Sequence, residues 1–168
     1  MPLPTRRSII AIAATFILVT SGLLAQPSSL PRFEDYHISE TFKGKPAPAK
    51  PKSADAKRFR TAIKEGAKEG PNFAGRYTIV TWGCGTACVM FAIVDARSGA
   101  VFMAPFTVSM GAHLNQEEDL IDYRPDSKLS VITGDLNEEE YGKYYYLWDK
   151  GQLKLLQRTE PNPVQEEE

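Results

Sequence analysis

The stretch Asn72–Cys88 reads NFAGRYTIVTWGCGTAC and contains both cysteines of the 168-residue chain. Its middle part, Arg76 to Trp82, is rich in β-branched and aromatic residues, which is typical of a strand. Side chains alternate between the two faces of a strand. One face is therefore expected to carry Tyr77, Ile79 and Thr81, and the other Thr78, Val80 and Trp82. The strand runs directly into a tight, glycine-rich loop.

The loop places Gly83 and Gly85 on either side of Cys84, with Cys88 four positions further on. An extended chain would hold the two cysteine Cα atoms roughly 13 Å apart, whereas a disulfide needs about 5.5 Å. Glycines adopt backbone angles that are closed to other residues, so they allow the loop to fold back. We therefore expect a Cys84–Cys88 disulfide. So short a ring adds at most about 2 kcal/mol of loop-closure entropy, so it shapes a loop rather than holding a fold.

Residues 1–25 have the organisation of an export signal. Arg6 and Arg7 form a basic start, Ser8 to Val19 is an almost continuous apolar run, and Ala25 is a small residue at the expected cleavage site. The paired arginines also fit, more weakly, a twin-arginine signal. The alternative is an uncleaved anchor helix, but the apolar run is short for a bilayer, which needs about 20 residues.

Export changes the interpretation of the cysteines, because oxidising compartments favour disulfides over reduced pairs. Cleavage would remove two of the 20 basic residues and none of the 21 acidic ones, leaving a formal charge of −3. Such a surface lacks the concentrated basic face of a nucleic-acid-binding protein. After the signal, no apolar run is long enough to cross a membrane. A periplasmic or secreted protein is predicted.

The chain after the signal divides into three parts. Residues 26–52 are rich in proline and predict a loosely structured linker. Residues 53–158 predict a single α+β domain, and residues 159–168 predict an acidic disordered tail. Within the domain, Ser53 to Gly70 has one apolar stripe, a possible N-cap at Ser53 and a Gly-Pro stop, which predict an amphipathic helix.

About six strands are expected after that helix, joined by short connections. Val89 to Val94 is apolar on both faces, which indicates a central strand covered on both sides. The remaining segments are polar or turn-rich, and Ser109 to Arg124 is interpreted as a long loop. Runs of strands with hairpin-like connections favour an antiparallel meander. The predicted fold is therefore one N-terminal helix packed on an antiparallel meander sheet.

The run PNFAGRYTIVTWGCGTACVMFAIVDARSG resembles a group of small exported bacterial proteins that share an NFAGxY lead-in and a WGCGxxC stretch. The turn at Pro125-Asp126-Ser127 and the closing Tyr-Tyr-Leu-Trp at 145–148 add to this resemblance, which covers about residues 53–156. It implies export and a common fold, and it carries over no catalytic residue. A looser likeness is to periplasmic inhibitors of vertebrate-type lysozyme, whose protruding disulfide-closed loop enters the target's active site. Those loops carry a histidine between the cysteines, and this chain has none there.

The sequence contains partial signals for other kinds of chemistry. The Cys-x-x-x-Cys spacing with a distant His113 resembles the copper-handling motif of cytochrome oxidase assembly factors, with Met90 or Met110 as soft partners. Those factors have a thioredoxin-like fold, which this strand pattern does not match. A reactive thiol would need a helix N-terminus or a nearby cation, and neither is evident beside Cys84. No Gly-x-Ser-x-Gly elbow of a serine hydrolase is present.

The stretch 144–148 is strongly aromatic. In a strand, Tyr144, Tyr146 and Trp148 share one face, which is either sheet packing or an exposed platform for a sugar or protein. Taken together, these patterns favour a non-enzymatic envelope protein that binds a protein or cell-wall ligand without a cofactor. The candidate binding residues are Trp82, Gly83, Gly85, Thr86 and Ala87, with Tyr144, Tyr146 and Trp148 as the candidate aromatic surface. The alternative is a copper-binding or thiol-redox protein that uses Cys84, Cys88 and His113. An enzyme with its chemistry elsewhere is a further alternative, and the sequence does not place its site.

Overall fold

The computed structural model describes residues 29–109 and 119–160 of the chain. Its strands join into one antiparallel sheet in the order β1-β2-β4-β6-β7-β8, with β3 beside β2 and β5 beside β6. The strands are β1 (Tyr77–Gly85), β2 (Cys88–Asp95), β3 (Val101–Met103), β4 (Val108–Ser109), β5 (Ile121–Tyr123), β6 (Leu129–Leu136), β7 (Glu140–Asp149) and β8 (Gln152–Thr159). The antiparallel, sheet-rich fold predicted from the sequence is confirmed.

The described residues contain eight strands instead of about six. The additional ones are short, and β5 lies inside the stretch that was interpreted as a long loop. It forms because Ile121 is buried in the core and pairs with Ile132 of β6. A three-residue strand leaves too little alternation in the sequence to be recognised.

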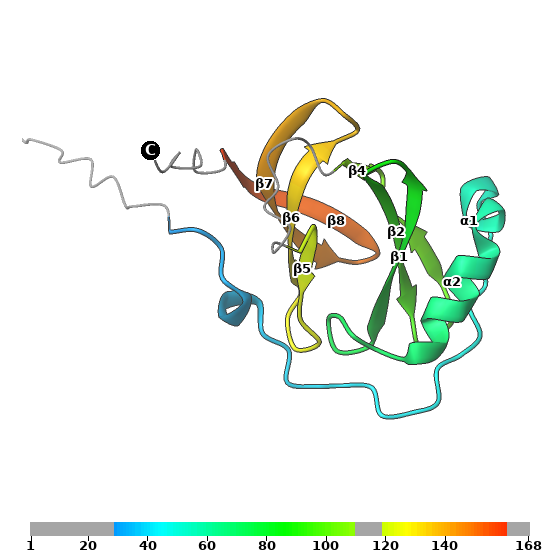
Figure 1. Cartoon of the computed structure of the whole chain (residues 1–168). Helices are drawn as coiled ribbons and strands as arrows, with labels where there is room; N and C mark the ends of the chain where they lie inside the picture. The colour runs from blue at the N-terminus through cyan, green and yellow to red at the C-terminus, as the bar shows by residue number, and fades with distance from the viewer. Residues whose placement is uncertain (1–28, 110–118, 161–168) are drawn as a thin grey trace, which may run out of the picture.

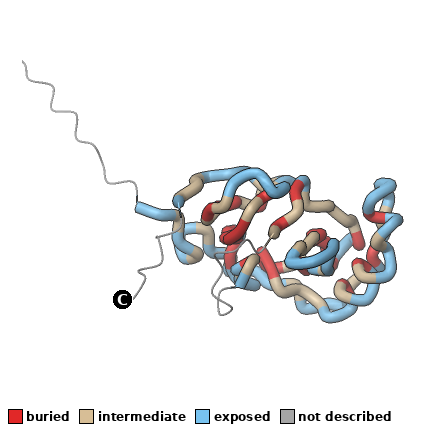
Figure 2. Tube along the Cα trace, turned by 45° about the horizontal axis from the view of Figure 1, so that its top comes forward, coloured by how far each residue is buried: buried red, intermediate tan, exposed pale blue. Residues whose placement is uncertain are grey.

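The sheet bends around one main core. This core combines Ile79 of β1, Phe91 and Ile93 of β2, Ile132 of β6 and Trp148 of β7. Figure 1 shows β1 and β2 facing β6, β7 and β8 across the molecule. Figure 2 shows the buried residues gathered in the interior of the domain and the exposed residues along its outer segments. The inner faces of both halves of the sheet therefore pack against each other.

The outer face of β1 and β2 is covered by short helices: α1 (Ala54–Arg58), α2 (Arg60–Gly66) and the 3-10 turn η2 (Ala67–Glu69). Ile63 and Ala67 pack there against Val80 and Val94. As predicted, Val80 and Ile79 face opposite sides of β1, and β2 is covered on both faces.

The single helix expected at 53–70 is divided into these three pieces. Ser53 caps α1 as predicted, because its Oγ accepts a hydrogen bond from the Ala56 backbone N–H. Phe59 then leaves the helical conformation, with φ −101° and ψ 20°. Its ring packs on Trp82 at 5.2 Å between centroids, a tertiary contact that the helical pattern alone does not contain. The segment ends at Gly70, whose φ is +91°.

The proline-rich segment is not a free linker over the residues that the structure describes. Its part from residue 38 to 50, here called the strap, lies along the domain and donates backbone hydrogen bonds to it. These are Ile38 N to Asp126 O, Phe42 N to Gly75 O, Ala47 N to Ala96 O and Lys50 N to Gly99 O, all 2.7–2.8 Å. Before the strap, the 3-10 turn η1 (Phe33–Tyr36) packs on the outer face of β6 and β7. Prolines remove backbone donors, but the residues between them supply enough to dock the segment.

The predicted signal at 1–25 and the tail beyond residue 160 lie outside the described residues. Thr159, placed in the tail by the sequence prediction, belongs to β8 and pairs with Lys143. Within the described part of the chain, no helix has the length and apolarity needed to span a membrane.

Candidate functional site

The candidate loop is the turn between β1 and β2, and residues 83–88 are here called the hairpin tip. The ladder runs from Tyr77 opposite Asp95 to Gly83 opposite Val89, and an irregularity then brings Gly85 opposite Cys88. Cys84 and Cys88 form a disulfide with a Cα–Cα distance of 5.1 Å. The predicted disulfide is therefore present, and it closes the loop at the end of the β1–β2 ladder.

The backbone of the hairpin tip explains one of its two glycines. Gly85 has φ +146°, in a region that side chains strongly disfavour. A Cβ at this position would have no heavy atom within 4 Å. The backbone conformation, and not a lack of space for a side chain, therefore favours glycine here. Ala87 also has a positive φ, +52°. The sequence prediction that glycine allows the loop to fold back is consistent with this conformation.

The hairpin tip is exposed and takes no part in the hydrophobic core. Gly83, Cys84, Gly85, Thr86 and Ala87 are all exposed, and Cys88 is half-buried. None of them belongs to a core cluster. Packing therefore does not account for a covalently closed loop at this place.

Trp82 stands at the base of the hairpin tip and is half-buried. One side of its indole packs on Phe59, and its Nε1 is buried without a hydrogen-bond acceptor. Met90 pairs directly opposite Trp82 on the same face and is also half-buried. These two side chains leave a small apolar surface immediately below the loop.

The prediction of an exposed aromatic surface on β7 is wrong. Tyr144, Tyr146 and Trp148 are only 7%, 8% and 4% exposed, because the face of β7 that carries them lines the main core. Tyr145, on the other face, is also buried, because it packs against Phe33 and Tyr36 of the N-terminal segment. Sheet packing, the other interpretation of the aromatic run, is what the structure shows.

Burial also fixes the acid–base behaviour of these rings. Loss of solvent raises the pKa of the Tyr145 and Tyr146 phenols above their ordinary value of 10.0. The hairpin tip, in contrast, has no ionisable side chain apart from its bonded cysteines. It therefore offers contacts and hydrogen bonds to a ligand, but no general acid, base or free nucleophile.

The described residues do not form a metal-binding or thiol-redox site. Both cysteines are joined to each other, so neither is a thiolate ligand in this state. Across residues 29–109 and 119–160 no group of three or more histidine, cysteine, aspartate or glutamate side chains could hold a metal ion. His113 and Met110, the remaining candidate ligands, lie outside the described residues.

Sequence reasoning missed a cleft of about 410 Å³ between the strap, the lead-in to β1 and the end of β7. Arg76 and Trp148, which line it, stand in two stretches that carry the family resemblance. The available signal was the collection of basic residues in turns, at Arg97, Lys128 and Lys150. Their meeting at one place depends on the tertiary fold.

Comparison of the chain with protein-family models, curated proteins and solved structures found no match. Membership of the group of small exported proteins with the WGCGxxC stretch therefore stays a prediction.

Proposed function

We propose that this protein is an exported, non-enzymatic binding module that presents the hairpin tip to a protein or cell-wall ligand. The observation that carries the proposal is the hairpin tip itself. It is exposed and disulfide-closed, it contributes nothing to the core, and it contains no free catalytic group. A structural role would place the disulfide between packed elements, and a catalytic role would require titratable neighbours.

A closed loop is well suited to binding because its shape is set before the ligand arrives. Binding costs free energy when loops must become ordered, and a covalent ring reduces that cost. The ladder of β1 and β2 holds the ring at its base, so the tip is positioned by paired strands. The half-exposed Trp82 and Met90 add apolar contact area, and tryptophan is among the residues that contribute most to interfaces.

Export belongs to the proposal. A disulfide is consistent with an oxidising compartment, and the first 25 residues have the pattern of an export signal. The proposed location is therefore the periplasm or the exterior of the cell. There the ligand would be an envelope protein or the cell wall.

The test replaces Thr86 by glutamate, which adds a larger and charged side chain at the hairpin tip. Thr86 is exposed, so the fold should be unaffected. The matched control is Thr61→Glu on α2, the same substitution at another exposed position. Purified protein is incubated with envelope extracts and with isolated cell wall, and bound material is identified by mass spectrometry or sedimentation. We expect Thr86→Glu to lose ligands that the wild type and Thr61→Glu retain. Identical binding by all three proteins would refute the role of the hairpin tip.

A further inference from the structure

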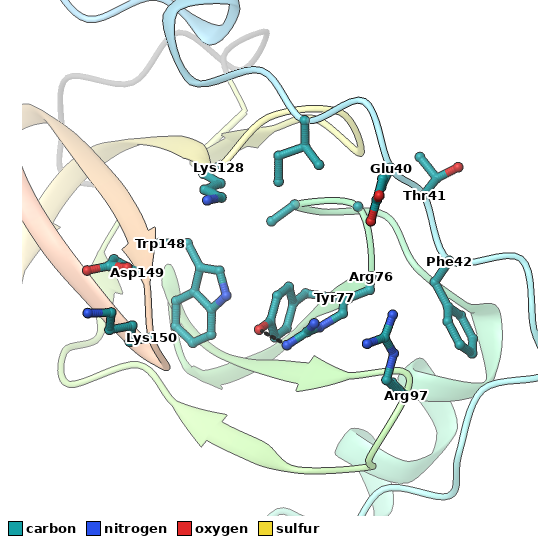
Figure 3. A pocket seen from close by; sticks show the side chains of 13 residues that line it. Glu40, Thr41, Phe42, Arg76, Tyr77, Arg97, Lys128, Trp148, Asp149 and Lys150 are labelled. Carbon is teal, nitrogen blue, oxygen red and sulfur yellow. Dashed lines mark hydrogen bonds between the residues drawn. The ribbon is translucent and has the colours of Figure 1, made fainter.

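The missed cleft joins four stretches that are far apart in the sequence. The lead-in at 72–77 meets the turn at 125–128, because the Gly75 backbone N–H donates to the Pro125 carbonyl at 2.6 Å. The end of β7 closes the third side, because Trp148 packs edge-on against Tyr77 at 5.2 Å between ring centroids. The strap forms the outer wall, with Phe42 N donating to Gly75 O. The cleft is therefore a product of the whole fold (Figure 3).

The cleft has an excess of positive charge. Four basic side chains line it, those of Arg76, Arg97, Lys128 and Lys150, against the acidic side chains of Glu40 and Asp149. Figure 3 shows Arg76, Arg97 and Lys128 around the cleft on three different segments, with Arg76 extending to the Tyr77 hydroxyl. Arg97, Lys128 and Lys150 are exposed, so water and salt screen part of their mutual repulsion, and a bound anion would relieve the rest.

The nearby carboxylates neutralise only part of this charge. Asp149 is held by Lys154, which lies outside the cleft lining. Asp95, behind the cleft, pairs with Arg76 at 3.5 Å. Among the described residues, the side chains of Arg97, Lys128 and Lys150 have no acidic partner within 4.0 Å.

The cations at this rim of the cleft also lower the pKa of Asp149. It is lowered first by the hydrogen bond from Lys154 and further by the charges of Lys154, Lys150 and Lys128. Two of the cleft lysines, Lys128 and Lys150, therefore stabilise the charged form of Asp149.

Two residues that line the cleft also carry a buried donor without an acceptor. They are Nε of Arg76 and Nε1 of Trp148, and neither has a hydrogen-bond partner. The Nη2 of Arg76 does donate, to the Tyr77 hydroxyl at 2.9 Å. Buried polar groups are nearly always paired, and an unpaired donor costs free energy. Both atoms are closed off from solvent, so they are unsatisfied polar groups behind the cleft surface and not contact points for a ligand.

We propose that this cleft is a binding site for a small organic anion, a carboxylate or phosphate carried on an apolar or aromatic body. The oxyanion faces Arg76, Arg97 and Lys128, and the body lies against Tyr77 and Phe42, which are half-buried cleft residues. A volume of about 410 Å³ lies in the usual range for small-molecule sites, about 300–1,000 Å³. Arginine suits this role because its planar fork binds carboxylate and phosphate in a bidentate way.

The site is separate from the hairpin tip. Tyr77 and Gly85 are the first and last residues of β1. Eight residue steps along a strand correspond to about 26 Å. The cleft and the hairpin tip can therefore be tested independently, and failure of one does not decide the other.

The experiment follows the indole N–H signals of the two tryptophans by NMR in the full protein. The Trp148 signal is assigned with a Trp82→Phe variant. The probes are phenyl phosphate, inorganic phosphate and, as the uncharged analogue, benzyl alcohol. We expect phenyl phosphate to shift the Trp148 signal with saturation and to leave the Trp82 signal in place. Inorganic phosphate should bind more weakly, and benzyl alcohol should cause no saturable shift.

Charge variants complete the test. Arg97→Ala and Lys128→Ala each remove one cation whose side chain makes no hydrogen bond or ion pair in the described structure, and unfolding midpoints verify that both variants fold. Each should weaken phenyl phosphate binding about tenfold, the equivalent of about 1.4 kcal/mol. The control, Lys64→Ala on the exposed side of α2, should leave the affinity within twofold. An unshifted Trp148 signal, or equal affinities for Arg97→Ala and Lys64→Ala, would overturn the site. Equal affinity for phenyl phosphate and inorganic phosphate would refute the claim that the site also binds an apolar or aromatic part of the ligand.

Discussion

Replacing both cysteines by serine should change the stability of this protein only modestly. The disulfide closes a ring with a sequence separation of 4, from Cys84 to Cys88. Loop-closure entropy for about five residues is about 7 cal/mol/K, which corresponds to about 2 kcal/mol at room temperature. Because the ring lies outside all three core clusters, no packing loss is added. The expected loss for the double variant is therefore at most about 2 kcal/mol.

A variant in the hydrophobic core gives a reference for this loss in the free energy of unfolding. Ile63 is fully buried between α2 and the outer face of β1, with 0% exposure. Ile63→Ala should cost about 2–5 kcal/mol through lost contacts and the cavity left behind. The disulfide variant is thus expected to be less destabilised than a single core truncation, although it removes a covalent bond.

Urea unfolding of the oxidised wild type, the double serine variant and Ile63→Ala measures all three free energies. Hydrogen exchange then locates the change: amides of the hairpin tip should lose protection in the double variant, while those of Ile79 and Ile93 should keep theirs. A loss above about 4 kcal/mol, or loss of protection at Ile93, would refute the reasoning. The disulfide would then hold the fold and not only the loop.

Three further outcomes follow from the packing. Gly75→Ala should release the strap, because Gly75 has φ +76° and a Cβ there would overlap the Glu40 carbonyl oxygen. Faster proteolysis within the strap would show this release, and an unchanged cleavage rate would contradict it. Trp148→Ala should cost about 3–5 kcal/mol in urea unfolding, whereas Leu155→Ala, at a residue that is 52% exposed, should stay within about 0.5 kcal/mol; similar losses would contradict the burial of β7. Burial raises the pKa of Tyr146, so the folded state keeps a proton that the unfolded chain loses above its pKa of 10.0. Stability should therefore be complete below about pH 10 and fall as the pH rises through the folded-state pKa, and a flat profile there would count against it.

Local patterns in the sequence were enough to predict the central hairpin. The alternation around Val80 and the folding back of the chain at Gly85 depend on neighbours within a few residues, and both appear in the structure as expected. The run from Val89 to Val94 likewise showed by composition alone that both of its faces are covered.

What the sequence did not reveal depends on contacts between distant segments. Alternation along β7 separated Tyr144 and Tyr146 from Tyr145, but it did not show what covers each face. The cover for Tyr145 comes from Phe33 and Tyr36, about a hundred residues earlier in the chain. The break at Phe59 and the assembly of the basic cleft arise in the same way, from contacts that no single stretch contains.

The most direct test of the binding proposal is site-specific photo-cross-linking in cells that express the protein. A photoreactive amino acid is placed at Thr86 in the hairpin tip or, as the control, at Thr61 on α2, both exposed positions. We predict a discrete cross-linked species from position 86 that is absent from position 61 and that disappears when both cysteines are replaced by serine. Equal cross-linking from both positions, or a species at position 86 that persists without the disulfide, would contradict a preformed binding loop.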